Sequence, residues 1–280
     1  MLLSQERPGK SGDKVLVEGR KLLQEAYLSG WMPEFLVLED GIADKWSEAP
    51  WNEIQEWVQA GVPAVFATAV QMARISRLAS PPPVVGVVRV PPDWPVRRQM
   101  PQAGSSERTL PPWWMVLEQI QDPGNLGNII RTADWYGFKG LICSTDTVNC
   151  YNPKVLQASM GSAFRMPVYY SELSPDALSR ITRMEWSIME DFEAENTLKQ
   201  NNTHVSIVGT VLAGGLGLGQ IKFPAQGGLL LIGNESRGLS LHLQGLCTHL
   251  VTIPAWGQAE SLNASVAAGI LAQAIRQQSE

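Results

Sequence analysis

Three polar segments of the sequence carry side chains that could bind an anion or a nucleoside. The first, residues 121–128 (QDPGNLGN), contains Asn125 and runs into an amphipathic stretch that carries Arg131. We predict a turn at its proline and glycine and a helix from about residue 128. Arg131 would then lie beside the N-terminal N–H groups of that helix, an arrangement that binds phosphate or an oxyanion. The same spacing also suits a structural role, in which Arg131 pairs with Asp134 and Asn125 caps the helix.

The second segment, residues 233–238 (GNESRG), follows an apolar run. Two glycines bracket an amide, the Glu235 carboxylate and a guanidinium, and glycine lets a ligand touch the main chain. A surface turn with a Glu235–Arg237 ion pair explains the composition equally well.

The third segment, residues 253–263 (IPAWGQAESLN), leads into a helix that is rich in small residues. Either Ser261 or Asn263 can cap that helix. The small residues predict very close packing, in a tight core or at a subunit interface.

The elements that position these segments alternate between strands and helices. Each segment follows a predicted strand, and ligands of open α/β sheets bind at the carboxyl ends of strands, so we predict that the three segments converge. Apolar runs without alternation are typical of strands that helices cover on both faces. After residue 113 the predicted strands are 115–120, 140–143, 187–189, 205–208, 229–232 and 249–253, and the predicted helices are 128–136, 153–160, 173–183 and 263–277.

The N-terminal part of the chain predicts a second, smaller α/β domain. Its predicted strands are 34–38, 63–66 and 84–90, its helices are 19–27, 52–59 and 69–78, and residues 15–18 suit a strand or a helix start. We therefore divide the chain into a substrate-binding domain (1–92), a linker rich in proline and arginine (93–112) and a catalytic domain (113–280). The arginines at positions 74, 77, 89, 97, 98 and 108 form either a solvated surface or a local nucleic-acid contact.

Composition restricts the possible functions. The 280 residues carry 22 basic and 27 acidic side chains, a net charge of −5, which excludes a large, uniformly basic nucleic-acid surface. The three cysteines and three histidines show no metal-ligand spacing, so we expect no metal site. The glycine cluster at 214–219 does not match the GxGxxG pattern of dinucleotide-binding proteins. A charged N-terminus and the lack of a long apolar run predict a cytoplasmic protein that does not enter membranes.

Taken in order, the three segments resemble the motifs of the SpoU (TrmH-like) family of RNA ribose 2′-O-methyltransferases, within the SPOUT class. The matching residues are Asn125-Leu-Gly127 with Arg131, residues 233–240 (GNESRGLS), and Ile253-Pro, Gly257 and Ser261-Leu-Asn263 with the helix that follows. The resemblance covers residues 113–280. Residues 17–23 (VEGRKLL) more weakly resemble the family's ribosomal-protein-like substrate-binding domain.

The resemblance implies an α/β catalytic domain with a deep trefoil knot and a homodimer, with the helix at 264–275 near its interface. It implies S-adenosylmethionine bound in the knot, mostly through the backbone at Gly233, Ile253 and Leu262, and no metal. The substrate would be rRNA or tRNA, with rRNA favoured by the N-terminal domain.

The implied reaction moves a methyl group from a sulfonium to a ribose 2′-oxygen. The resemblance assigns Arg131 the stabilisation of the developing alkoxide and the binding of the adjacent phosphate. A literal base role conflicts with the proton that arginine normally keeps. Asn125, Glu235 and Asn263 would orient Arg131 and the ribose, and Ser261 would position the same site through its hydroxyl.

Two other functions stay open. One is a non-catalytic RNA-binding or ribosome-associated module that kept the fold, and loss of Arg131, Glu235 or Asn263 would favour it. The other is an α/β enzyme with a nucleotide cofactor, whose glycine fingerprint is missing. Because all three polar residues are present, the sequence favours the methyltransferase.

Overall fold

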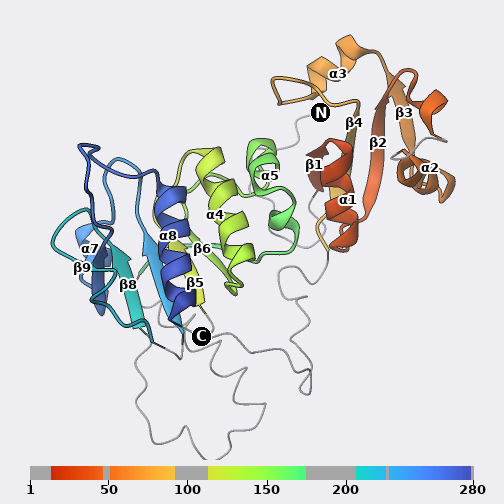
Figure 1. The fold of residues 1–280 in the computed structure, drawn as a ribbon. Helices are drawn as coiled ribbons and strands as arrows, with labels where there is room; N and C mark the ends of the chain where they lie inside the picture. Colours follow the sequence, from red (N-terminus) through yellow and green to blue (C-terminus); the bar gives the residue numbers. More distant parts are fainter. Residues whose placement is uncertain (1–13, 47–50, 92–112, 175–205, 225–226, 279–280) are drawn as a thin grey trace, which may run out of the picture. The chain divides into compact units, whose positions relative to one another are not determined.

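The structure, a computed structural model, describes residues 14–46, 51–91, 113–174, 206–224 and 227–278 (Figure 1). The chain divides into two compact units, residues 1–100 with 149–167 and residues 101–148 with 168–280. The linker predicted at 93–112 and the strand predicted at 187–189 lie outside the described residues, as does the helix predicted at 173–183 from residue 175 onward.

The first unit has a four-stranded sheet in the order β1-β4-β2-β3. The β4 strand pairs antiparallel with β1 and β2, and β2 pairs parallel with β3. The strands and helices predicted for this part of the chain are confirmed. Leu22, Leu23 and Ala26 bury one face of the first helix against this sheet. The elements are β1 (Lys14–Glu18), α1 (Arg20–Leu28), β2 (Pro33–Glu39), η1 (Ile42–Lys45), α2 (Asn52–Gln59), β3 (Ala64–Ala67), α3 (Ala69–Ile75) and β4 (Val84–Arg89).

A later piece of the chain completes the core of the first unit. It comprises α5 (Pro153–Ser159) and η2 (Ser162–Phe164). The indole of Trp31 is fully buried, lies edge-on to the rings of Tyr151 and Phe164, and donates a 3.0 Å hydrogen bond to the Phe164 carbonyl. The aromatic cluster therefore explains why residues 149–167 belong to this unit.

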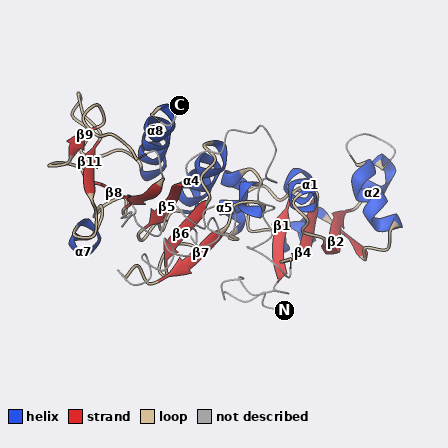
Figure 2. Ribbon diagram, turned by 90° about the horizontal axis from the view of Figure 1, so that it is seen from below, coloured by secondary structure: helices blue, strands red, loops and turns tan. Residues whose placement is uncertain are grey.

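The second unit has a seven-stranded parallel sheet in the order β7-β6-β5-β10-β8-β11-β9 (Figure 2). Its β5, β6 and β10 strands are buried along their whole length, as their apolar runs predict. The elements are β5 (Trp113–Leu117), α4 (Pro123–Trp135), β6 (Gly140–Ser144), β7 (Val168–Ser171), β8 (Ser206–Thr210), β9 (Leu216–Gly217), β10 (Gly228–Ile232), α7 (Leu241–Gln244), β11 (His249–Thr252) and α8 (Ala264–Gln277).

The strand register brings the three polar segments to one edge of this sheet. Val116 lies opposite Leu231, Leu231 opposite Gly209, and Gly209 opposite Leu250, so the four form one row across β5, β10, β8 and β11. Because the strands are parallel, the segments that follow β5, β10 and β11 leave the sheet on the same side. The prediction that they converge rests on this register.

Five short elements escaped the sequence prediction: η1, η2, β7, β9 and α7. The two-residue β9 lies in the glycine cluster that lacks a dinucleotide fingerprint. There, a Cβ on Gly215 would come within 2.8 Å of the Val251 carbonyl carbon. Gly215 therefore serves close packing of the chain on β11, whereas a Cβ on Gly214 or Gly219 would meet nothing within 4 Å. The trefoil knot stays a prediction of the resemblance.

Helices α4 and α8 lie side by side on one face of the sheet (Figures 1 and 2). At their C-terminal ends Arg276 joins them, because its guanidinium donates to the carbonyls of Tyr136 (2.6 Å) and Gly137 (2.9 Å). The same group lies 5.3 Å from the centre of the Phe138 ring. Burial lowers the pKa of Arg276 below its usual value.

We expect Arg276→Met to lower the free energy of unfolding by about 2 kcal/mol, because two part-buried carbonyls lose charged donors. Gln277→Met, on the exposed side of the same turn, is the matched control and should change it by less than about 0.5 kcal/mol. Urea unfolding followed by tryptophan fluorescence measures both. Equal unfolding midpoints for the two variants would show that Arg276 does not hold the helices together.

Candidate active site

One continuous hydrogen-bond chain joins the three polar segments. The amide nitrogen of Asn263 donates to the amide oxygen of Asn125 over 2.7 Å. The amide nitrogen of Asn125 donates in turn to a carboxylate oxygen of Glu235 over 2.8 Å. Asn125 is buried, so its one side chain links all three segments.

The cap of α8 fixes the orientation of Asn263. Its Oδ1 accepts hydrogen bonds from the backbone N–H groups of Ser265 (2.9 Å) and Val266 (3.4 Å). Because the oxygen is used in this way, the amide N–H₂ is left to reach Asn125. Of the two predicted caps, Asn263 is therefore correct and Ser261 is not.

The start of α4 differs from the prediction. The helix begins at Pro123 rather than near residue 128, because Asp122 caps it by accepting from the Asn125 N–H over 2.8 Å. Proline then occupies the first helical position, where no donor is needed. The predicted cap by Asn125 is wrong, and its side chain is free for the chain of hydrogen bonds.

Arg131 consequently lies in the third turn of α4, and its side chain is exposed. The prediction that it accompanies the N-terminal N–H groups of the helix is wrong. The reason is the earlier helix start, which moves Arg131 away from the helix end without burying it.

Asn234, which sequence reasoning missed, shapes the loop that carries Glu235. Its Oδ1 accepts from the N–H groups of Ser236 (2.9 Å) and Arg237 (3.2 Å), and its Nδ2 donates to the Gln119 carbonyl over 2.8 Å. Gln119 has a positive φ of 56°, uncommon outside glycine. The signal in the sequence was an asparagine next to glycine, the composition of an Asx turn.

Gly233 permits the closest backbone approach at the site. A Cβ at this position would lie 2.1 Å from the Gly238 carbonyl carbon and 2.2 Å from the Leu239 nitrogen. The chain thus folds back on itself directly after β10, with a bridge between Asn234 and Gly238. No other residue type fits there.

A pocket of about 480 Å³ opens beside this loop. Glu235, Ser261 and all three predicted cofactor contacts, Gly233, Ile253 and Leu262, line it. Its volume suits a nucleoside-sized ligand. The other lining residues are Thr210, Val211, Leu212, Ile232, Asn234, Gly238, Val251, Pro254, Ala255, Trp256, Gly257, Ala259, Glu260, Ala264, Ala267 and Ile270.

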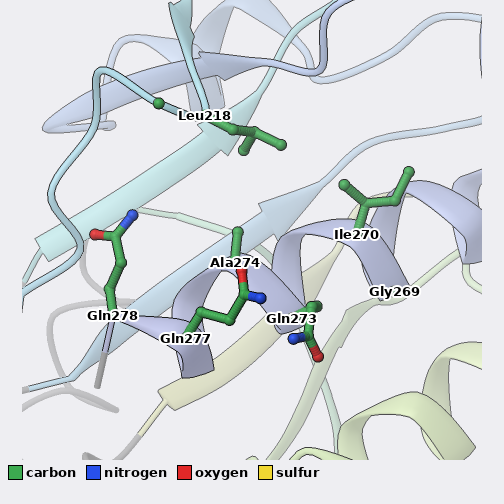
Figure 3. Close-up of a pocket in the computed structure, with 8 residues that line it drawn as sticks. Leu218, Gly269, Ile270, Gln273, Ala274, Gln277 and Gln278 are labelled. Carbon is green, nitrogen blue, oxygen red and sulfur yellow. The ribbon is translucent and has the colours of Figure 1, made fainter. Parts of the chain in front are cut away.

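A shallower depression lies along the exposed side of α8 (Figure 3). Gly269, Ile270 and Ala274 form its helical wall, and Leu218 faces them from the segment after β9. Glutamines 273, 277 and 278 provide its polar groups. Ile270 belongs to both hollows, so the depression adjoins the pocket.

Within the described part of the chain, no three His, Cys, Asp or Glu side chains are grouped so that they could hold a metal ion. No described helix is long and apolar enough to cross a membrane.

The chain matches the model of the SpoU rRNA methylase family over residues 112–273. A 23S rRNA (uridine(2479)-2′-O)-methyltransferase of Streptomyces viridochromogenes is 31% identical, and the match covers 99% of this chain and 87% of the relative. The 23S rRNA (guanosine(2553)-2′-O)-methyltransferase RlmP of Bacillus subtilis is 26% identical, and the match covers 93% of this chain and 88% of the relative.

Solved structures agree with the sequence matches. The SpoU methyltransferase AviRb of Streptomyces viridochromogenes, in complex with AdoMet, superposes with a TM-score of 0.73 at 28% identity. That match covers 95% of this chain and 90% of the other. An AdoMet-bound rRNA methyltransferase of Sinorhizobium meliloti gives a TM-score of 0.69 at 28% identity, covering 94% and 87% of the two chains.

Alanine substitutions at two glycines that line the pocket test how closely the backbone packs there. We expect Gly233→Ala to cost about 1–3 kcal/mol of stability, because the new methyl group meets backbone atoms that cannot move aside. At Gly257, in the same pocket, a Cβ meets nothing within 4 Å, so Gly257→Ala should be nearly neutral. Thermal unfolding of both variants makes the comparison, and an unaffected Gly233→Ala protein would contradict it.

Proposed function

The chain belongs to the SpoU rRNA methylase family, and we propose that its substrate is a ribose 2′-hydroxyl of 23S rRNA. It is an S-adenosylmethionine-dependent RNA ribose 2′-O-methyltransferase. Two relatives that match over nearly the whole chain are named as 23S rRNA enzymes, which favours rRNA over tRNA. A non-catalytic role finds no support among these relatives. An rRNA substrate agrees with the cytoplasmic location predicted from the sequence.

The observation that carries the assignment of the active site is the hydrogen-bond chain Asn263–Asn125–Glu235 beside the pocket. Glu235 is part of the hydrogen-bond chain and also lines the pocket, so the hydrogen-bond chain and the ligand site are adjacent. The side-chain oxygen of Asn125 accepts from Asn263, and its side-chain nitrogen donates to Glu235. We therefore assign it a positioning role.

The pocket suits S-adenosylmethionine. Backbone at Gly233, Ile253 and Leu262 would hold the ligand, since all three residues line the pocket. Bound there, S-adenosylmethionine supplies an electrophilic methyl group on a sulfonium. Ser261 lines the same wall and offers a hydroxyl that can orient the ligand or the ribose.

Arg131 acts on the RNA that accepts the methyl group rather than on S-adenosylmethionine, the methyl donor. A ribose hydroxyl is a weak nucleophile, so a nearby positive charge must favour its deprotonated form. The guanidinium keeps its own proton and instead donates hydrogen bonds to the developing alkoxide and to the neighbouring phosphate. Its exposure on α4 leaves it accessible to a polymeric substrate.

The exposed apolar face of α4 and α8 favours a homodimer. Trp135, at the C-terminal end of α4, is 84% exposed. Near the start of α8, Val266 is 48% exposed, and Ile270, one turn further along the same face, lines the depression of Figure 3. Exposed apolar side chains gathered on one helix face typically mark an interaction site. The small residues of α8 allow the partner helix to approach closely.

Arg131→Ala tests the proposed catalysis. We expect the rate of methyl transfer to fall about 10²–10³-fold, the usual cost of losing one preorganised donor. Affinity for S-adenosylmethionine should hardly change, because Arg131 does not line the pocket. Arg131→Lys should not restore the rate, since an ammonium lacks the planar fork. Single-turnover methylation of rRNA from a strain that lacks the enzyme measures the rate. Near-normal transfer by folded Arg131→Ala protein would refute the role.

Aspartate substitutions test the dimer. Trp135→Asp and Val266→Asp should convert a dimer into monomers at micromolar concentration, because they bury a charge in the apolar interface. Leu241→Asp is the control, since Leu241 is also 84% exposed but lies on α7. Light scattering gives the masses. A wild-type protein with the mass of one chain would contradict the proposal.

A further inference from the structure

The pocket wall carries negative charge. Among the described residues that line it, Glu235 and Glu260 are carboxylates and none is lysine, arginine or histidine. Apart from Trp256 and a few uncharged polar groups, the remaining lining is aliphatic side chain and backbone. Such a wall favours a cation over a neutral ligand of the same shape.

An aromatic ring accompanies the carboxylates. Trp256 is the one aromatic residue among the described lining residues, and its side chain is 92% exposed. Its indole therefore makes little contact with the rest of the chain and is available to a ligand. Indole is the aromatic ring that binds cations best, and sulfonium and ammonium compounds bind to such faces.

Of the two carboxylates, Glu260 is the one free to respond to a ligand. Glu235 already accepts a hydrogen bond from Asn125 and is held by the polar chain. Glu260 lies on the loop before Ser261, and its side chain is exposed. Changing it leaves the Asn263–Asn125–Glu235 chain intact.

We propose that Glu260 and Trp256 make the pocket selective for the positively charged sulfonium of the methyl donor over the neutral thioether product. The inference rests on the proposed function, because it takes the pocket to be the donor site. In the reaction the methyl–sulfur bond breaks and the methyl–oxygen bond forms. The electron pair stays on sulfur, which loses its charge, and the hydroxyl proton goes to solvent. The product then leaves the same pocket more readily than the donor.

Titration calorimetry with three ligands tests the selectivity. S-adenosylmethionine and sinefungin carry a positive charge at the reacting position, whereas S-adenosylhomocysteine does not. We expect the wild-type protein to bind the two cations about fivefold more tightly than S-adenosylhomocysteine, the factor expected for a charge pair about 4 Å apart in surroundings close to water. Raising the salt concentration should reduce this preference.

Glu260→Gln should bring the three affinities to within about twofold of one another, mainly by weakening the binding of the two cationic ligands. Trp256→Leu should also weaken the binding of the cationic ligands more than the binding of S-adenosylhomocysteine. Glu172→Gln is the matched control, because Glu172 is exposed in the same unit and does not line the pocket. It follows β7, the outermost strand at the other end of the strand order from β11. This variant should keep the wild-type ratio.

The outcomes separate this inference from the proposed function. Equal wild-type affinities for all three ligands, or an unchanged ratio in Glu260→Gln, would overturn the selectivity while leaving the methyltransferase assignment in place. Absence of S-adenosylmethionine binding by the folded wild-type protein would overturn the donor site itself.

Discussion

The side chain of Asn125 is the constraint on which the rest of the site depends. One buried amide accepts from Asn263 and donates to Glu235, and so joins segments that are 110 and 138 residues away in the sequence. The two bonds contribute only about 1–3 kcal/mol each, the larger value belonging to the bond with the carboxylate, which is far too little to assemble three loops. The sheet assembles them, because its parallel strands deliver all three segments to one edge. The amide then fixes which orientation the side chains adopt there.

The helices α4 and α8 are held together by polar contacts at both of their ends. Asn125 lies in the first turn of α4 and Asn263 caps α8, while Arg276 ties the other ends of the same helices. With a contact at each end, α4 and α8 are held parallel, and neither can slide without breaking a polar contact. Arg131, between the two ends of α4, therefore has its backbone fixed while its side chain stays accessible.

The sequence predicted the strands, the helices and the convergence of the three polar segments far better than the local geometry within those segments. Apolar runs such as that of β10 and the small residues of α8 suffice for the elements. The sequence prediction starts α4 too late, because proline and glycine at 123–124 also suit a turn. Asp122 before Pro123 is nevertheless a helix-start signal. The placement of residues 149–167 with the first unit and the bond from Asn234 to the Gln119 carbonyl depend on contacts between distant segments. No local pattern encodes such contacts.

The arrangement of charge explains how an acidic protein handles an anionic substrate. A wall with Glu235 and Glu260 repels phosphate, so the RNA backbone has to be held outside the pocket. Arg131 does not belong to that wall and is exposed on α4. With the roles proposed above, the two substrates would be separated by the sign of their charge: the sulfonium would face carboxylates and the phosphate would face a guanidinium. On this view the net charge of −5 is no obstacle to RNA binding, because only the acceptor side of the site needs positive charge.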